Sequence, residues 1–260
     1  VACARYYEYY GGAADKVHGH QIPYLNGHYA TTEHIPLGVT AHIIPWNYPA
    51  QMFPRSVGPA LAMGNAVIMK PAEDACSVPL VLADILLEAG FPPGAINMVT
   101  GLGAEAGAAL SNHPGVNFIS FIGSTETGGL VQQAAARNHI GCTMELGGKS
   151  AQIVFADADP ALTVPTVVGA ITQHAGQTCS AGSRLLIERS AMDTLLPLIA
   201  EAFSKVRVVM PWMEGELGPV VNARQKARVE GYQKLAEEDG LPIMAAGQMS
   251  PELSEDGYFV

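Results

Sequence analysis

The sequence has little positive charge and no long apolar run, and both shortages narrow what the chain can do. Its 14 lysines and arginines stand against 24 aspartates and glutamates, so the basic surface that a phosphate backbone requires is missing. No stretch of about 18 apolar residues exists, and the first residues lack the basic-then-apolar layout of a signal peptide. We therefore expect a globular cytoplasmic protein whose partners include neither nucleic acid nor a membrane.

Cysteine is also scarce, and its spacing excludes several kinds of site. Cys3, Cys76, Cys142 and Cys179 lie far apart, so no CxxC pair indicates zinc, a redox couple or a disulfide framework. The histidines show no metal-ligand spacing either, and we expect no metal. Cys179 differs from the other three because GQTCSAGS places it between polar residues and close to glycines. It is either a small buried hydrophobe or a nucleophile.

From Val39 to Gly148, short β-branched runs alternate with helical segments, a pattern typical of a parallel sheet with helices on both faces. The expected strands cover residues 39–45, 66–70, 96–101, 117–123 and 143–148. A helix is predicted over 77–90, with Ser77 as its cap and Val78, Leu82, Ile85 and Leu86 on its buried face. Another helix is predicted to begin near Ser124 or Thr125.

The pattern restarts after Gly148, which indicates a second domain. It contains helix-like stretches at 191–205 and 222–238 and strand candidates at 243–247 and 257–260. The first 36 residues look like an arm rather than core, with a hairpin signal at Asn26-Gly27. We predict an α/β protein: a Rossmann-like parallel-sheet cofactor domain over 1–147, with a hairpin arm at about 18–36, and part of an α/β catalytic domain over 148–260.

Several polar motifs follow the predicted strands. GSTETG at 123–128 opens a helix, where backbone N–H groups favour a pyrophosphate, although its glycines could also serve only the turn. GLGAEAG at 101–107 is one residue too long for the usual dinucleotide fingerprint, so an ordinary Rossmann unit is not expected. Lys70 and Glu73 could bind ribose hydroxyls at a strand end, or form a solvated surface pair.

Two further residues have chemistry that fits a reaction centre. Asn47 lies in the Pro-bounded segment PWNYP, where its amide could donate to a developing oxyanion or cap the following helix. Glu145 ends a predicted strand just before two glycines, where a carboxylate could act as a base or as a cap.

In this order and at these spacings, PWNYP, KPAE, FIGSTETG, MELGGKS and GQTCSAGS resemble the aldehyde dehydrogenase superfamily over essentially the whole chain. The resemblance implies an enzyme that oxidises an aldehyde to an acid with NAD(P)+ and water. It implies that Cys179 is the nucleophile, Glu145 the general base and Asn47 an oxyanion donor. Further positions implied for the cofactor are Ile44, Pro45, Trp46, Lys70, Glu73, Gly103, Gly123, Ser124, Leu146 and Gly147, and for the substrate pocket Tyr48, Met52, Arg55, Thr178 and Ser180.

The same resemblance bears on cofactor choice and assembly. Glu73 would accept from a ribose 2′-hydroxyl and repel a 2′-phosphate, so NAD is expected rather than NADP. A homodimer or homotetramer is expected for the full-length protein. Family members continue into a Glu-x-Phe-Gly-Pro stretch that contacts the nicotinamide ribose, and the 260 residues alone are expected to be inactive.

The substrate is the least determined feature. Arg55 follows Asn47 by eight residues, as in the semialdehyde branch, which favours an aldehyde with a distal acid group; alternatively, Arg55 pairs with a neighbouring acid. Gln173 stands where that branch has a second arginine, and an aromatic aldehyde is the other candidate. Two rival functions are a CoA-acylating relative, a group that lacks the base glutamate, and a non-catalytic fragment or binding protein, which would be expected to lose Cys179, Asn47 or Glu145.

Overall fold

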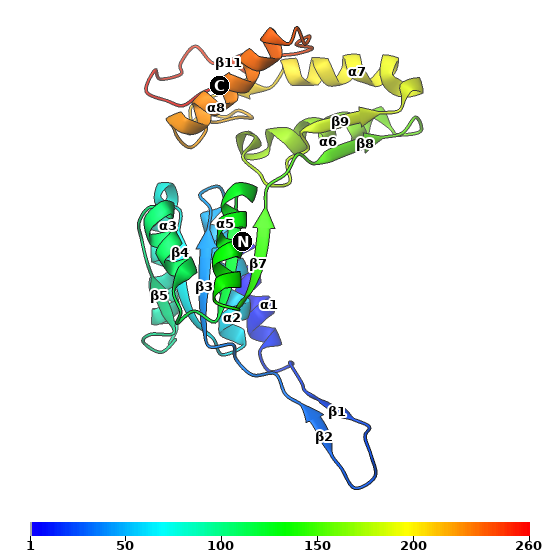
Figure 1. The fold of residues 1–260 in the computed structure, drawn as a ribbon. Coiled ribbons are helices and arrows are strands. Elements are labelled where there is room, and N and C mark those ends of the chain that lie inside the picture. Colours follow the sequence, from blue (N-terminus) through cyan, green and yellow to red (C-terminus); the bar gives the residue numbers. More distant parts are fainter. Residues whose placement is uncertain (1) are drawn as a thin grey trace. The chain divides into compact units, whose positions relative to one another are not determined.

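The computed structural model describes residues 2–260, and the chain divides into two compact units. The first unit ends at Leu146 and the second begins at Gly147, one residue before the predicted boundary. Figure 1 labels the elements of both units, and each unit is described here by itself. The assignment of cofactor binding to the first unit and catalysis to the second stays a prediction.

A five-stranded parallel sheet forms the centre of the first unit, in the spatial order β5-β4-β3-β6-β7. Its strands are β3 (Val39–Ile44), β4 (Ala66–Pro71), β5 (Ile96–Met98), β6 (Phe118–Gly123) and β7 (Gly141–Leu146). The chain order therefore reverses between β3 and β6. Open α/β sheets bind ligands outside the carboxyl ends of their strands at such a reversal.

The predicted strands are present; three of them agree with the predicted bounds to within one residue, and the other two differ by more. β5 stops at Met98 rather than at residue 101, and β7 covers 141–146 rather than 143–148. Each of these two strands ends where its ladder of paired residues ends. Met69 pairs with Met98 at the end of the β4–β5 ladder, and Gly123 pairs with Leu146 at the end of the β6–β7 ladder.

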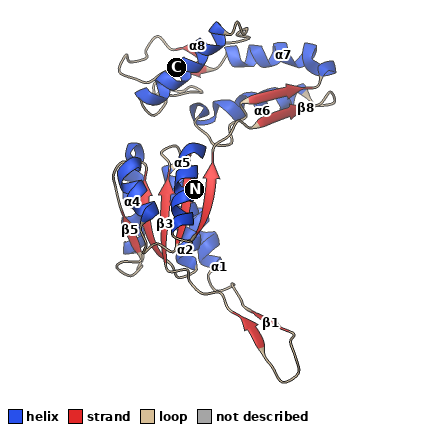
Figure 2. Ribbon diagram, viewed as in Figure 1, coloured by secondary structure: helices blue, strands red, loops and turns tan. Residues whose placement is uncertain are grey.

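Helices cover both faces of the sheet, which gives a three-layer α/β arrangement (Figure 2). The four helices are α2 (Pro49–Ala62), α3 (Ser77–Glu88), α4 (Ala108–Asn112) and α5 (Thr125–Arg137). One apolar cluster joins Phe53 of α2 to Met69 of β4 and includes residues of α3. The other cluster joins Ile119 of β6 to Val131 of α5 and includes Leu110 of α4. The two faces are thus filled by separate cores.

The predicted helix at 77–90 is present as α3, but its predicted cap and part of its predicted buried face are wrong. Ser77 is the first helical residue rather than the cap, and the buried positions are Pro79, Ala83 and Leu86. Val78 and Ile85 are 40% and 50% exposed. Apolar residues lie all round this helix, so their periodicity selects no single stripe and tertiary contacts decide which side is buried.

The first residues form a packed helix, which corrects the prediction of an arm over the first 36 residues. Helix α1 (Ala2–Ala13) contacts α2. Gln51 Nε2 of α2 donates to the Tyr6 hydroxyl at 3.5 Å, and Tyr7 packs against the cluster that contains Phe53. The tyrosines of this segment do not alternate with a clear polar face, so the sequence did not indicate the contact between α1 and α2.

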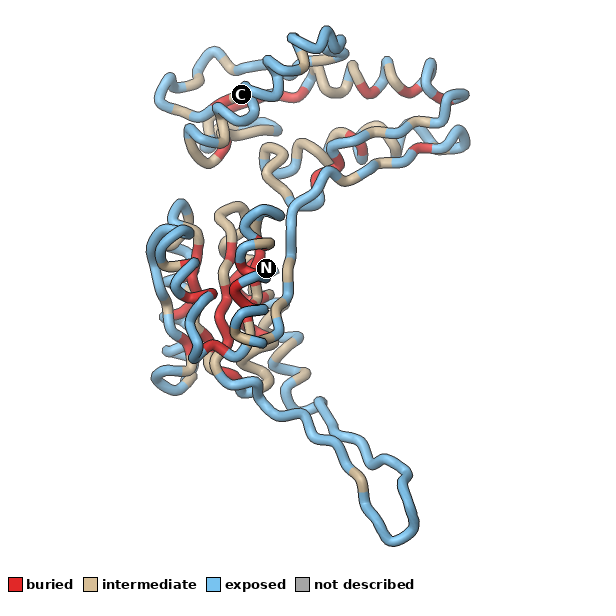
Figure 3. The backbone as a smooth tube through the Cα atoms, viewed as in Figure 1, coloured by how far each residue is buried: buried red, intermediate tan, exposed pale blue. Residues whose placement is uncertain are grey.

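The hairpin itself is confirmed. Strands β1 (His20–Ile22) and β2 (Ala30–Thr32) pair antiparallel, and the His28 N–H donates to the Leu25 carbonyl at 3.1 Å to close the turn. Gly27 sits at φ +83°, a conformation that favours glycine. In Figure 3 this segment is almost entirely exposed, whereas buried positions gather in the strands of the five-stranded sheet.

The second unit has a smaller core. Its elements are β8 (Ala151–Val154), α6 (Pro160–Thr172), β9 (Arg184–Ile187), α7 (Arg189–Ser204), β10 (Arg207–Val208), α8 (Ala223–Glu238) and β11 (Gln248–Met249). β8 and β9 are parallel, and Val154 of β8 packs in one apolar cluster with Val167 of α6 and Leu195 of α7. The second unit also contains the short helical turn η3 (Gln173–Gly176). The first unit contains two such turns, η1 (Glu73–Ala75) and the π-helical η2 (Gly103–Gly107).

The helices predicted at 191–205 and 222–238 are confirmed as α7 and α8, but the strands predicted at 243–247 and 257–260 are wrong. Residues 248–249 form β11 instead, because they are the ones that pair with β10. Local propensity carries no information about such a partner. Within residues 2–260, no helix combines the length and apolar character needed to cross a membrane.

Candidate active site

Most predicted site residues of the first unit lie where the parallel strands end. Ile44 is the last residue of β3, with Pro45, Trp46 and Asn47 in the loop that follows. Gly123 ends β6, and Leu146 ends β7 immediately after Glu145. Because these strands are parallel neighbours, their ends share one edge of the sheet.

The segment between β3 and α2 shows which residue caps the helix. Tyr48 holds the N-cap position, and its carbonyl accepts from the N–H groups of Gln51 and Met52 at 3.0 and 2.8 Å. Pro49 is the first helical residue, where its missing N–H costs nothing. Asn47 precedes this cap and is half-buried, so the alternative in which Asn47 occupies the cap position does not hold.

Lys70 and Glu73 form an ion pair in which the lysine is buried and the glutamate is exposed. The Lys70 side chain is 2% exposed, and its Nζ donates to the Pro71 carbonyl at 2.8 Å and to Glu73 Oε2 at 3.4 Å. The alternative of a solvated surface pair is therefore wrong for the lysine. Glu73, 39% exposed, presents the accessible end of the pair.

Helix α5 begins with a side-chain cap. Ser124 Oγ accepts from the Thr127 N–H at 3.2 Å, which satisfies one of the unpaired donors of the first turn. A Cβ on Gly123 would lie 2.6 Å from the Phe121 ring, and one on Gly128 would lie 2.6 Å from Leu146 Cδ2. Gly128 therefore allows α5 to approach the sheet closely, and Gly123 leaves room for the Phe121 ring at the end of β6, which gives these glycines the structural role that the sequence left open.

The segment GLGAEAG forms a single π-helical turn that leads into α4. Gly103 opens this turn in open space, with no heavy atom within 4 Å of the position of a Cβ. Gly107 closes it, and a Cβ there would contact the aliphatic chain of Lys70 at 3.7 Å. The glycine-rich turn after β5 therefore packs beside Lys70, the next-to-last residue of β4.

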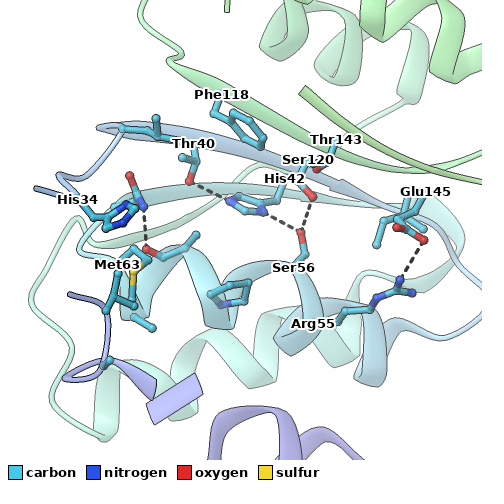
Figure 4. Close-up of a pocket in the computed structure, with 18 of the residues that line it drawn as sticks. His34, Thr40, His42, Arg55, Ser56, Met63, Phe118, Ser120, Thr143 and Glu145 are labelled. Atoms are coloured by element: carbon cyan, nitrogen blue, oxygen red, sulfur yellow. Dashed lines mark hydrogen bonds and ion pairs between the residues drawn. The ribbon is translucent and has the colours of Figure 1, made fainter. Parts of the chain in front are cut away.

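The side chains of Arg55 in α2 and Glu145 in β7 point toward each other, as Figure 4 shows. Arg55 Nη2 donates to Glu145 Oε2 at 2.9 Å, and Nη1 lies 3.9 Å from the sulfur of Met52. Both charged residues line a cavity of about 700 Å³. Met52 is 6% exposed and belongs to the core rather than to the cavity wall. Arg55 thus pairs with an acid, which is one of the two alternatives left open by the sequence.

A buried chain of polar side chains lies in the same cavity wall, and the sequence analysis did not identify it. His42 Nε2 lies 2.9 Å from Thr40 Oγ1, His42 Nδ1 lies 2.7 Å from Ser56 Oγ, and Ser56 Oγ lies 3.1 Å from Ser120 Oγ. Burial lowers the pKa of His42 to about 4, so the imidazole is neutral at pH 7. The alternation of Thr40 and His42 along a buried strand was the available signal.

In the second unit, Cys179 lies in an exposed turn. The Ala181 N–H donates to the Thr178 carbonyl at 3.1 Å, which places Cys179 and Ser180 at the centre of the turn. Cys179 is exposed, whereas Cys3, Cys76 and Cys142 are only partly accessible, and burial raises the pKa of Cys3. Accessibility is what a nucleophilic thiol needs, so the reading of Cys179 as a buried hydrophobe does not hold.

Two features outside the motif fix this turn. Gln152 of β8 donates from Nε2 to the carbonyls of Gly182 at 2.8 Å and Val167 at 3.2 Å, and it was missed because it is remote in sequence. On the other side, His174 and Ala175 both adopt φ +53°. Left-handed non-glycine residues are rare and cost free energy, so the surrounding packing determines this bend.

The residues that end the strands fit a dinucleotide better than a metal. Among residues 2–260, no group of three or more His, Cys, Asp or Glu could hold a metal ion. This edge of the sheet has two features that suit NAD. The first turn of α5 packs against Phe121 of β6 and Leu146 of β7, and the exposed carboxylate of Glu73 lies beside the Lys70 amine.

The chain matches the model of the aldehyde dehydrogenase family over residues 1–260. It is 41% identical over 254 residues to hydroxyisobutyraldehyde dehydrogenase from Mycolicibacterium austroafricanum, covering 97% of this chain and 50% of that relative. It is also 41% identical over 263 residues to a mitochondrial aldehyde dehydrogenase from Equus caballus, covering 100% of this chain and 51% of that relative. The chain spans about half the length of the curated relatives it matches.

Solved structures give the same result. A crystal structure from Burkholderia cenocepacia, assigned as an aldehyde dehydrogenase, matches with a TM-score of 0.97 and 53% identity, covering 100% of this chain and 55% of that chain. The NAD+ complex of an aldehyde dehydrogenase from Bacillus cereus matches with a TM-score of 0.94 and 36% identity, covering 100% of this chain and 52% of that chain. These likenesses confirm the predicted α/β fold.

Proposed function

Because this chain belongs to the aldehyde dehydrogenase family, as its motifs predicted, we propose that the full-length protein oxidises an aldehyde to a carboxylic acid with NAD+ and water. The observation that carries the proposal is the state of Cys179. It is the exposed thiol among the four cysteines, in a turn fixed by Gln152, at the position where the family has its nucleophile.

In this reaction the Cys179 thiolate attacks the aldehyde carbon, and the carbonyl oxygen becomes an oxyanion to which the Asn47 amide donates. Bound NAD+ would supply the acceptor for the hydride that leaves the former aldehyde carbon. The remaining thioester on Cys179 is then attacked by water, from which the Glu145 carboxylate removes a proton. The acid leaves, and the thiolate is restored.

The cofactor proposal rests on the strand ends of the first unit. We assign the pyrophosphate to the first turn of α5, where Ser124 already provides the cap, and the adenine-side ribose to Glu73 and Lys70. Relatives whose structures contain NAD+ support this choice of cofactor. The NAD preference follows from the accessible carboxylate of Glu73, which a 2′-phosphate would meet as a like charge.

The test is NADH formation by the full-length protein with a panel of aldehydes, with and without CoA. We expect turnover without CoA, its loss in Cys179→Ser, and its retention in the matched variant Cys76→Ser. Glu145→Gln should form NADH once and then stall as the thioester. A requirement for CoA would indicate an acylating enzyme instead, and the absence of NADH in every condition would indicate a binding protein.

We also propose that the full-length protein is a homodimer or homotetramer. Apolar residues of the hairpin arm support this, because Tyr24, Leu25 and Tyr29 are 67%, 65% and 90% exposed. Light scattering of the intact protein and of a variant with all three residues changed to serine tests the assembly. The cytoplasmic location stays a prediction that fractionation of cells can check, since a similar protein from Equus caballus is mitochondrial.

A further inference from the structure

The charges of Arg55 and Glu145 cancel within the cavity that both residues line. Their side chains are 35% and 56% exposed, so water and small solutes reach the ion pair. In the described cavity wall, Arg55 is the sole lysine or arginine and Glu145 the sole acid. A second carboxylate beside Arg55 would leave two negative charges to share one positive charge.

We infer that Glu145 occupies the guanidinium group that an acid-bearing aldehyde would need, so that the site selects neutral aldehydes. This inference rests on the proposed function and on the substrate-pocket position that the family resemblance implies for Arg55. A guanidinium binds a carboxylate through a planar pair of donors, and Glu145 already takes one of these positions at 2.9 Å. Because it belongs to the same unit, its effective concentration exceeds that of a free substrate.

The rest of the cavity wall holds no second lysine or arginine, and its two histidines are His34, at the opposite end of the wall from Arg55 (Figure 4), and His42. His42 is buried, both of its ring nitrogens lie within hydrogen-bond distance of hydroxyl groups, and its pKa of about 4 keeps it neutral. Phe118, Ile122 and Met63 contribute apolar surface to the same cavity. A neutral alkyl or aryl group matches these surroundings better than a charged one does.

The experiment compares aldehydes that differ by one carboxylate: butanal with succinic semialdehyde, and benzaldehyde with 4-carboxybenzaldehyde. The measured quantity is the second-order rate constant of the first NADH formation in the full-length protein, a step that precedes thioester hydrolysis. Using the ratio of two aldehydes on one preparation removes the folded fraction from the comparison. We expect the unmodified protein to favour the neutral member of each pair by about tenfold or more.

The variants test the role of Glu145 directly. Glu145→Gln should release Arg55 and raise the acid-to-neutral ratio by about tenfold, because the substrate then supplies the partner carboxylate. Adding Arg55→Met to that variant should return the ratio to its starting value, whereas adding Arg55→Lys should keep part of the gain. Glu88→Gln, which removes an exposed acid from α3, should leave the ratio unchanged.

The outcomes separate this inference from the proposed function. No NADH with any aldehyde would overturn the proposed function itself. NADH formation with an unchanged ratio in Glu145→Gln, or a preference of the unmodified protein for the acid-bearing members, would overturn the inference while leaving the proposed function intact.

Discussion

Nδ1 of His42 and Oγ of Ser56 lie 2.7 Å apart, and this contact joins the central strand β3 to helix α2. The imidazole is buried and its pKa is lowered to about 4 from an ordinary value of 6.5. Between these two pH values the unfolded chain binds a proton that the folded chain excludes. Stability from this group is therefore fully present above pH 6.5 and is lost as the pH falls toward 4.

We predict that the first unit loses about 3 kcal/mol of unfolding free energy between neutral pH and pH 4 through His42 alone. The measurement is urea unfolding at several pH values, followed by Trp46 fluorescence in a Trp212→Phe background. His42→Gln should lower stability at pH 7 but show a flatter dependence on pH. Parallel curves for the two proteins would contradict the prediction.

Ser124 should have separable effects on stability and on cofactor binding. Ser124→Ala removes the cap of α5 and should cost about 1 kcal/mol. Ser124→Asp keeps an acceptor for the Thr127 N–H, so stability should be retained, but it adds a negative charge beside the proposed pyrophosphate site. Its Kd for NAD+, measured by calorimetry, should rise by about tenfold. Equal affinities in Ser124→Asp and the unmodified protein would place the pyrophosphate elsewhere.

Glu73 should decide the choice between NAD and NADP. Glu73→Gln keeps an acceptor near the Lys70 amine but removes the charge that a 2′-phosphate would meet. The ratio of Kd values for NADPH and NADH should fall by about fivefold or more, measured by cofactor fluorescence. Asp84→Asn removes one exposed charge from α3 and serves as the control. The role assigned to Glu73 fails if both variants leave the ratio where it was.

The left-handed bend before Cys179 should respond in opposite directions to two neighbouring substitutions. Ala175→Gly relieves a φ of +53° and should stabilise the second unit by about 1 kcal/mol. Gly176→Ala places a Cβ 3.3 Å from the Ile171 carbonyl at φ +72° and should destabilise it by a similar amount. Unfolding followed by Trp212 fluorescence in a Trp46→Phe background measures both. A gain in stability from Gly176→Ala would show that the bend is not left-handed.

Local signals in the sequence account for much of the fold. β-Branched runs gave β3, β4 and β6, and Gly90, at φ +101°, marked the end of α3. The same signals failed where a distant partner decides, as for β11, which exists because β10 lies beside it. The prediction of the buried side of α3 failed for the same reason, since Val78 and Ile85 are as apolar as the residues that are buried.

The candidate site divides in the same way. Motif residues such as Cys179 and Glu145 could be proposed as candidates because each lies in a short segment with a recognisable pattern. The acid that pairs with Arg55 could not be identified, because the two residues are 90 positions apart in the chain. His42, Ser56 and Ser120 come from three elements, and only the pairing of β3 with β6 brings Ser120 opposite His42. Such networks are properties of the assembled sheet.

Asn47 and Glu145 depend on strands with different support. Asn47 follows β3, which pairs with β4 on one side and β6 on the other, whereas Glu145 belongs to β7, which within residues 2–260 pairs with β6 alone. Backbone amides of an edge strand open to solvent more readily than those of a strand held on both sides. The loop that carries Asn47 therefore follows a strand that is held on both sides, whereas Glu145 belongs to a strand at the edge of the described sheet. Any segment that pairs with the free side of β7 acts directly on the position of Glu145.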